Sequence, residues 1–329
     1  MIKIPLNYPI FVINCSLIMA KASLPTFQFA FLKPKYWGFW LGLAIWRLIL
    51  LLPYPMLLKI GHGFGWLFAK LSVGKRRAKI VRRNLQLCFP QYSESQIDEI
   101  LHRNLQSTGM AIIETGMAWF WSDKRIRKWC KIEGLENLSH HGKDGVIFVG
   151  VHFLTLELGA RIVGIDQPGI GVYRPNDNPL MDWLQTYGRL RSNKDMLERK
   201  DLRGMIKALR QGEIIWYAPD HDYGRKNAVF VPFFAVKDAA TTTGSYYLLK
   251  SAPNSRVIPF APLRHADGSG YTVKISPPVD FSDLDSDVEI AKRMNHIVEQ
   301  EILRGIDQYM WLHRRFKTRP NREEPSLYD

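Results

Sequence analysis

Cysteine is scarce in this chain of 329 residues, which contains only Cys15, Cys88 and Cys130. The three lack the close spacing of metal-binding motifs, and an odd, sparse set argues against a disulfide framework. The sequence therefore indicates a reducing compartment, and we expect neither a bound metal nor a cofactor. There is also no internal repeat and no low-complexity tract, so the length is that of one large domain or two small ones.

Acidic residues are outnumbered, because 31 Asp and Glu stand against 45 Lys and Arg and give a formal net charge of +14. Such a charge attracts anionic partners, which are nucleic acid, anionic lipid or an acidic protein. No recognised nucleic-acid-binding motif is present, so we expect no nucleic acid partner. An anionic lipid surface and an acidic protein remain as candidate partners.

The one long apolar stretch runs from Tyr36 to Leu58. Spanning a bilayer takes about 20 such residues, but a charge such as Arg47 near the middle costs roughly 3 kcal/mol on insertion scales. The sequence leaves open a single membrane span, which it slightly favours, and an interfacial helical anchor. We assign the anchor to residues 24–60. The basic run 74–83 that follows predicts, by the positive-inside rule, that the rest of the chain faces the cytoplasm.

Residues 1–23 have two interpretations. Ala20-Lys21-Ala22 resembles the cleavage site of a signal peptide, although Pro9 and Asn14 interrupt the apolar segment before it. Alternatively, translation starts at Met19 and the residues before it are not part of the protein. N-terminal sequencing of the purified protein distinguishes the two.

The order of the remaining elements predicts an α/β fold. A helical part extends to about residue 140, and within it Ser93 and Gln96 form a capping box ahead of apolar residues at helical spacing. Short apolar runs then alternate with helical segments. We expect strands at 146–151, 170–173, 213–218, 229–234, 256–262 and 271–275, and helices at 154–163, 180–192, 201–211, 240–250 and 284–304. This alternation predicts a mixed, mostly parallel sheet sandwiched by helices, with a membrane-associated helix at the N-terminus.

The end of the first strand carries the clearest chemical signal. His152 follows this strand directly, at the position where open α/β sheets place their sites. If His152 lies in the turn that enters the next helix, Glu157 can hold one ring nitrogen and leave the other free as a general base. The simpler alternative is a core histidine beside a surface glutamate, and the two-residue pattern does not separate these interpretations.

Polar residues also follow the next strands. Arg174 follows the second strand, and Asp220, His221 and Asp222 follow the third. The ends of parallel strands meet at one edge of a sheet, so these side chains can converge on one cleft. The alternative for the Asp-His-Asp segment is a turn with Asx hydrogen bonds.

The four ordered blocks resemble those of the glycerolipid acyltransferase superfamily. They are His152 with Glu157, Val172–Pro175, Tyr217–Asp220 and Val257–Phe260. The chain more closely resembles the lipid A biosynthesis acyltransferases of the Kdo-lipid IVA lauroyltransferase type, from about residue 24 to 319. Longer blocks carry this second resemblance, at 169–179, 183–194, 229–234 and 308–320. Two positions depart from the wider superfamily, because many of its members have Asp at the Glu157 position and Pro-Glu-Gly where this chain has Pro219-Asp220-His221.

The resemblance implies O-acyl transfer, with a lauroyl chain, from acyl carrier protein to a hydroxyl of a lipid A precursor in lipopolysaccharide biosynthesis. It implies a location at the bacterial inner membrane, with the catalytic domain 61–329 facing the cytoplasm. His152 would be the base, Glu157 its orienting carboxylate and Arg189 the first candidate for oxyanion stabilisation. Residues implied in binding the anionic glycolipid or the acidic carrier are Arg174, Asp220, His221, Arg191, Lys194, Arg314 and Arg315. Arg174 is the second oxyanion candidate, and Asp220 would orient one of the arginines.

Two other functions stay open. One is a glycerophospholipid acyltransferase that uses acyl-CoA, which the long block 183–194 disfavours. The other is a membrane-bound lipid-binding protein without catalysis, which the His152 and Glu157 pair disfavours. For each basic residue the alternative is a solvated surface beside an anionic membrane.

Overall fold

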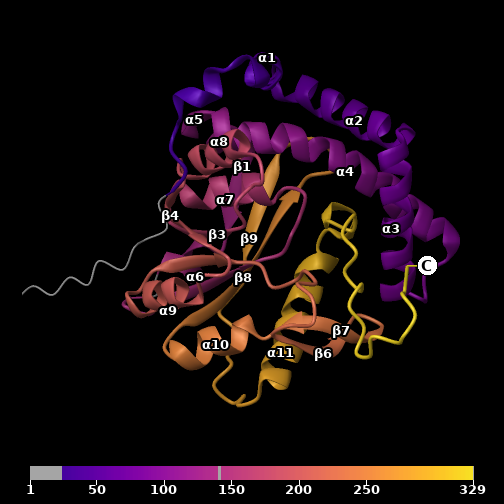
Figure 1. The fold of residues 1–329 in the computed structure, drawn as a ribbon, viewed down its shortest axis with the longest axis vertical. Helices are drawn as coiled ribbons and strands as arrows, with labels where there is room; N and C mark the ends of the chain where they lie inside the picture. The colour runs from indigo at the N-terminus through magenta and orange to yellow at the C-terminus, as the bar shows by residue number, and fades with distance from the viewer. Residues whose placement is uncertain (1–23, 140–141, 329) are drawn as a thin grey trace, which may run out of the picture.

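A seven-stranded sheet forms the centre of the protein in the computed structural model, which describes residues 24–139 and 142–328 (Figure 1). The strand order is β1-β9-β8-β2-β5-β3-β4, and every neighbouring pair is parallel except β8 and β9. The strands are β1 (Cys130–Glu133), β2 (Val146–Gly150), β3 (Gly169–Tyr173), β4 (Asn193–Glu198), β5 (Ile214–Tyr217), β8 (Arg256–Arg264) and β9 (Tyr271–Ile275). The predicted mixed, mostly parallel sheet between helices is confirmed.

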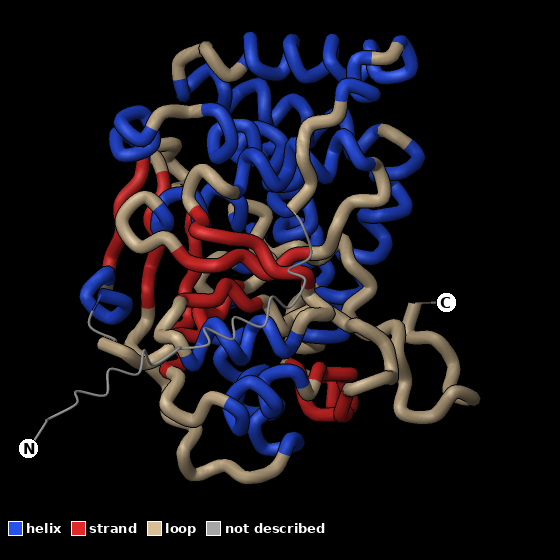
Figure 2. Tube along the Cα trace, turned by 60° about the vertical axis from the view of Figure 1, so that its left-hand side comes forward, coloured by secondary structure: helices blue, strands red, loops and turns tan. Residues whose placement is uncertain are grey.

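Helices cover both faces of the sheet (Figure 2). In the described residues the helices are α1 (Trp37–Ile49), α2 (Tyr54–Lys70), α3 (Ser72–Cys88), α4 (Glu94–Phe120), α5 (Asp123–Trp129), α6 (Leu135–Ser139), α7 (Leu156–Gly164), α8 (Pro179–Arg189), α9 (Leu202–Arg210), α10 (Gly244–Ser251) and α11 (Asp287–Leu303). Strand β2 contributes Val146 and Phe148 to the core under α4, α7 and α8, and Ile147 and Val149 to the core under α9, α10 and α11. Its continuous apolar run is therefore buried on both faces.

Two predicted elements differ from the structure. Residues 229–234 form a strand, but β6 (Ala228–Phe233) pairs antiparallel with β7 (Val236–Thr242) in a separate hairpin outside the main sheet. The predicted helix 240–250 begins only at Gly244, because its first residues belong to β7. The edge strands β1 and β4 were not predicted, since both are short and only partly buried.

The apolar stretch 36–58 is divided between two helices, because Pro53 ends one segment and α2 begins at Tyr54. No helix in residues 24–139 and 142–328 is long and apolar enough to cross a membrane, so the favoured single span is not confirmed. One side of α1 packs on the core through residues such as Leu43 and Trp46. The other side exposes a stripe at helical spacing, formed by Trp37, Leu41, Ile45 and Leu48.

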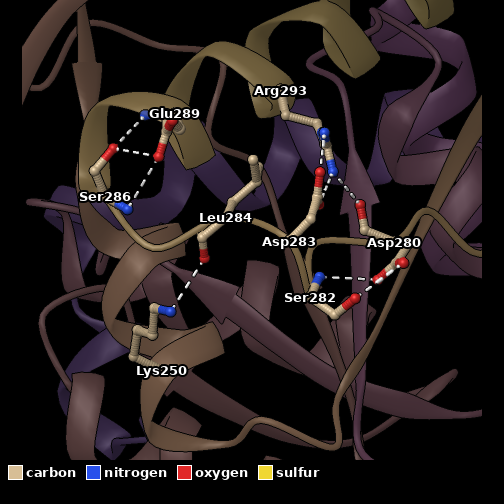
Figure 3. A network of polar contacts seen from close by, with 8 residues as sticks. All are labelled: Lys250, Asp280, Ser282, Asp283, Leu284, Ser286, Glu289 and Arg293. Carbon is tan, nitrogen blue, oxygen red and sulfur yellow. Dashed lines mark hydrogen bonds and ion pairs between the residues drawn. The ribbon is translucent and has the colours of Figure 1, made fainter.

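The connection into α11 is tied down by its own side chains (Figure 3). Ser286 and Glu289 form a capping box, and the guanidinium of Arg293 donates to both carboxylate oxygens of Asp283, at 2.5 and 3.0 Å. Lys250 of α10 donates to the carbonyl of Leu284 at 3.1 Å. Lys250 and Arg293 therefore both have partners within the protein.

Candidate active site

His152 lies in the turn between β2 and α7, as the sequence predicted. Its main chain is held on both sides. The backbone N–H donates to Oδ2 of Asp220 at 3.1 Å, and the carbonyl accepts from the N–H of Met310 at 2.9 Å. The imidazole therefore extends from a fixed backbone at the carboxyl edge of the sheet, where groups from several strands converge.

Asp220 is the carboxylate that holds the ring. Strand β5 lies beside β2 with Tyr217 opposite Val149, so Asp220 and His152 are each three residues beyond a paired position. Oδ1 of Asp220 lies 2.7 Å from Nδ1 of His152. The side chain of Asp220 is fully buried, whereas the ring of His152 is 23% exposed. The ring therefore has one side fixed in the core and the other open to a substrate.

The electrostatics of the pair favour a single tautomer. Burial alone would raise the pKa of Asp220, but the positive charge of protonated His152 and its hydrogen bonds outweigh burial and hold that pKa below its ordinary range. An ionised carboxylate only accepts hydrogen bonds, so Nδ1 of His152 carries the proton and donates it. Nε2 then has a free lone pair, and no described residue donates a hydrogen bond to it. This is the arrangement of a general base.

Glu157 does not hold His152, contrary to the expectation from the sequence. It lies in the first turn of α7, and its carboxylate accepts from Nε of Arg189 at 2.9 and 3.2 Å, from Nη2 of the same residue, and from Nε1 of Trp119 at 3.2 Å. The end of α8 brings Arg189 to this position because Gly188 packs directly on the indole of Trp119, where a Cβ would lie 2.3 Å from the ring. The predicted role of Asp220 in orienting an arginine is also wrong, since both of its oxygens serve His152.

Glu157 and Arg189 form an ion pair. Burial would raise the pKa of Glu157, but the Arg189 guanidinium outweighs burial and lowers it. Burial would likewise lower the pKa of Arg189, and the Glu157 carboxylate raises it instead. The pair uses Nε and Nη2 of the arginine, while Nη1 has no partner among the described residues. Its two N–H groups can donate to an anion or to a polarised carbonyl.

Two further histidines stack behind His152. The rings of His152 and His221 lie 3.6 Å apart with an interplanar angle of 12°, and His313 stacks on the far side of His221 at 4.4 Å. Burial, and next the charge of protonated His152, lower the pKa of His221 to about 2. Burial also lowers the pKa of His313. Both rings therefore stay neutral near pH 7 and form a flat wall that fixes the plane of the His152 ring.

The donor atoms of His152, Asp220 and His221 lie within 4.8 Å of one another, which is close enough for a metal site. The geometry does not suit one. A bound metal lies in the plane of each imidazole ligand, and the two rings are stacked nearly parallel. Both oxygens of Asp220 are already engaged by His152. A hydrogen-bonded pair accounts for these contacts without an ion.

Three predicted binding residues lie in the turn after β3, in the turn after α8 and on β4. Arg174 is exposed and pairs with Asp177 at 3.2 Å. Arg191 donates to the carbonyl of Trp119 at 2.7 Å. Lys194 pairs with Glu213 at 2.7 Å, at the starts of β4 and β5. Parallel strands place their starts at the edge opposite their ends, so Lys194 lies away from His152, and its predicted substrate contact stays a prediction.

The C-terminal segment 308–320 contains two predicted binding residues in different settings. Arg315 is 1% exposed, donates to the carbonyl of Ala240 at 2.7 Å and lies over the ring of Phe233. A side chain so placed holds the segment against the β6–β7 hairpin, and its predicted substrate contact is wrong. Arg314 is exposed and lies over the ring of Tyr328. Of the two, Arg314 alone is accessible to a ligand.

Sequence reasoning missed the contacts that two further residues make in the site. Trp119 donates to Glu157 from the end of α4, and His313 completes the histidine stack from the C-terminal segment. Both act across long sequence separations, and no local pattern shows which side chain each of them contacts.

Comparisons with known proteins agree on one family. The model of the family described as bacterial lipid A biosynthesis acyltransferase matches residues 24–318. A lipid A biosynthesis acyltransferase of Haemophilus influenzae is 73% identical over 94% of this chain and all of its own length. The lipid A biosynthesis lauroyltransferase of Escherichia coli is 54% identical, over 93% of this chain and 99% of its own. The palmitoleoyltransferase of the same organism is 48% identical, over 92% and 98%.

Proposed function

The chain belongs to the bacterial lipid A biosynthesis acyltransferases, and we propose that it transfers a fatty acyl chain, lauroyl, from acyl carrier protein to a hydroxyl of a lipid A precursor, with His152 as general base. The observation that supports this role is the His152–Asp220 contact, which leaves Nε2 free at the carboxyl edge of the sheet. The lauroyl chain is favoured by the lauroyltransferase relative, which is 54% identical against 48% for the palmitoleoyltransferase.

The proposed reaction moves one proton in and out of His152. Nε2 takes the proton of the acceptor hydroxyl while that oxygen attacks the carbonyl carbon of the thioester. The tetrahedral intermediate then collapses, the carbon–sulfur bond breaks, and the imidazolium returns its proton to the leaving sulfur. Asp220 stabilises the imidazolium between these steps. General base catalysis of this kind contributes about 10²- to 10⁴-fold.

Arg189 is the proposed donor to the developing oxyanion. Its Nη1 is the available group, and Glu157 fixes the guanidinium through the other side of its fork. A preorganised donor in a partly buried site stabilises charge that appears only in the transition state. Glu157 is thus a positioning residue in this proposal, acting through the arginine.

Acyl transfer by the purified full-length protein tests the proposal. With lauroyl carrier protein and a lipid A precursor that carries free hydroxyls, we expect the product mass to rise by one lauroyl group. His152→Ala should abolish most of this turnover, and Lys292→Ala, at an exposed position of α11, should not change it. Efficient transfer from acyl-CoA to a glycerophosphate acceptor, with none to the glycolipid, would contradict the proposal. A preference for palmitoleoyl over lauroyl carrier protein would overturn only the proposed identity of the acyl chain.

We also propose that α1 lies in the interface of the inner membrane and that the site faces the cytoplasm, where carrier protein is present. The exposed stripe of Trp37, Leu41, Ile45 and Leu48 supports this. An amphipathic helix binds a bilayer by burying such a face at the boundary of headgroups and acyl chains. The cations of α3, which comes after α2 in the chain, suit an anionic lipid surface.

Flotation with vesicles that contain anionic phospholipid tests this membrane contact. We expect the protein to float with the vesicles, and the triple variant Leu41→Ser, Ile45→Ser, Leu48→Ser to remain largely unbound, since each lost apolar side chain removes about 1.5–3 kcal/mol of burial in lipid. The matched control is Val288→Ser with Leu303→Ser, which changes exposed apolar residues of α11. Equal binding of the triple variant and the control would rule out α1 as the contact.

A further inference from the structure

An unneutralised basic surface surrounds α9, on the face of the sheet opposite α1 and α2. Its members are exposed cations that follow β4 or lie on α9, namely Arg199, Lys200, Arg203, Lys207 and Arg210. Within residues 199–211 the only acidic residue is Asp201, whose carboxylate caps α9 by accepting from the N–H of Gly204 at 2.8 Å. None of the five cations forms an ion pair with a residue that the structure describes. We call these five residues the α9 basic surface.

On the neighbouring surface of α10 and α11, by contrast, two cations have acidic partners. There, Lys250 pairs with Asp285 at 2.7 Å. Arg293 pairs with Asp283, as Figure 3 shows. The α9 basic surface thus repels like charge without internal compensation. A concentration of one sign of charge raises the association rate of a partner of the opposite sign.

A hollow runs along this surface between α9 and α10. It has a volume of about 400 Å³ and is lined by Arg203, Ile206, Lys207, Arg210, Gln211 and Ser251. Ile206 offers an apolar contact with three cations around it. Such a hollow suits a protein helix that presents an apolar side chain between carboxylates.

A chain of ring contacts joins the α9 basic surface to the catalytic histidine. The ring of His221 stacks on His152, the ring of Tyr223 lies 6.4 Å from that of His221, and the guanidinium of Arg199 lies 5.7 Å from the ring of Tyr223. The N–H of Arg199 also donates to the carbonyl of Tyr173 at the end of β3, at 2.7 Å. The α9 basic surface therefore begins at the edge of the sheet where His152 lies and extends away from that edge.

We propose that the α9 basic surface docks the acidic carrier protein that delivers the acyl thioester, an inference that rests on the proposed carrier-dependent function. The position of α9 favours a soluble partner over a lipid surface. The apolar stripe lies on α1, which packs with the core on one face of the sheet, whereas α9 packs on the other face and lies far from α1 in Figure 1. A carrier seated on α9 approaches from the side away from the membrane.

The test compares two donors in the full-length protein. Arg203→Glu with Lys207→Glu should lower kcat/KM for lauroyl carrier protein by about 10- to 100-fold, since charges at the rim of an interface act mainly on the association rate. Turnover of lauroyl pantetheine, which carries the same thioester without a protein, should stay within about twofold. Added salt should slow the wild-type reaction with the carrier and leave the variant almost unchanged.

Direct binding gives a second measurement, which does not depend on turnover. By fluorescence anisotropy, the Kd of a labelled carrier should rise about tenfold or more in the double variant, and should stay unchanged in the control Lys237→Glu with Lys292→Glu. An equal loss with both donors would overturn the proposal, as would an unchanged Kd. Reduced flotation of the α9 variant with unchanged carrier affinity would assign the surface to lipid instead. A wild-type protein that uses acyl-CoA but not the carrier would instead refute the proposed function itself.

Discussion

Replacing Asp220 by asparagine lowers the rate of acyl transfer by about 10³- to 10⁴-fold, as the same change does in triads where an aspartate holds the catalytic histidine. The amide of asparagine can donate to Nδ1 of His152, which moves the ring proton to Nε2 and removes the lone pair that accepts the substrate proton. The imidazolium also loses the charge that stabilises it. The side chain keeps its size in a fully buried position, so the fold is retained.

Asp222 provides the matched control for this substitution. It is also buried, but it accepts from the N–H of Thr318 at 2.8 Å and from the hydroxyl of the same residue at 2.9 Å. Asp222→Asn should therefore lower the melting temperature and change kcat by less than about tenfold. Single-turnover rates together with melting curves separate the two effects. An Asp220→Asn protein whose rate is within tenfold of wild type would remove Asp220 from the mechanism.

Replacing Arg189 by alanine lowers kcat by about 10²- to 10³-fold, the loss expected when one donor to a developing oxyanion is removed. KM should change little, because the donor acts on charge that forms in the transition state. Arg189→Lys should not restore the rate, since lysine lacks the planar fork that engages Glu157 on one side and leaves Nη1 free on the other.

The controls for Arg189 are its own partners. Glu157→Gln should lower kcat by less than Arg189→Ala, and adding it to Arg189→Ala should cause little further loss, because Glu157 acts through the arginine. Trp119→Phe removes only the indole donor to Glu157 and should cost less than about tenfold. Steady-state kinetics at varied glycolipid concentration measure both constants. A large rise in KM with unchanged kcat would assign Arg189 to acceptor binding in place of oxyanion stabilisation.

The place of His152 could be predicted from the sequence, but its hydrogen-bond partner could not. His152 stands between a buried strand and a helix, and both are local patterns. Asp220 reaches it because β5 lies beside β2, although β3 and β4 come between them in the chain. Strand order follows from packing of the whole sheet, which the residues around His152 do not encode. Glu157 was the nearest carboxylate in sequence, whereas α8 places Arg189 against it.

The charged and apolar surfaces show the same limit. Arg315 is a cation in a basic segment, which from the sequence suggests a binding residue. Its burial, however, depends on how the C-terminal segment folds over the β6–β7 hairpin. The stretch 36–58 is long enough in sequence to span a bilayer, and only the break at Pro53 and the packing of α1 divide it. Whether acidic side chains from the described residues pair with the cations around α9 likewise depends on which helices are its neighbours in space.

In the proposed mechanism His152 and Asp220 act as one unit, and Glu157 belongs to another. The most direct test is the single-turnover rate of lauroyl transfer in His152→Ala, His152→Ala with Asp220→Asn, and His152→Ala with Glu157→Ala. Residues that act as a unit are strongly non-additive. We predict that adding Asp220→Asn leaves the residual rate of His152→Ala unchanged, while adding Glu157→Ala lowers it further, by about tenfold or more. The proposed mechanism would be contradicted if adding Glu157→Ala left the residual rate of His152→Ala unchanged while adding Asp220→Asn lowered it further.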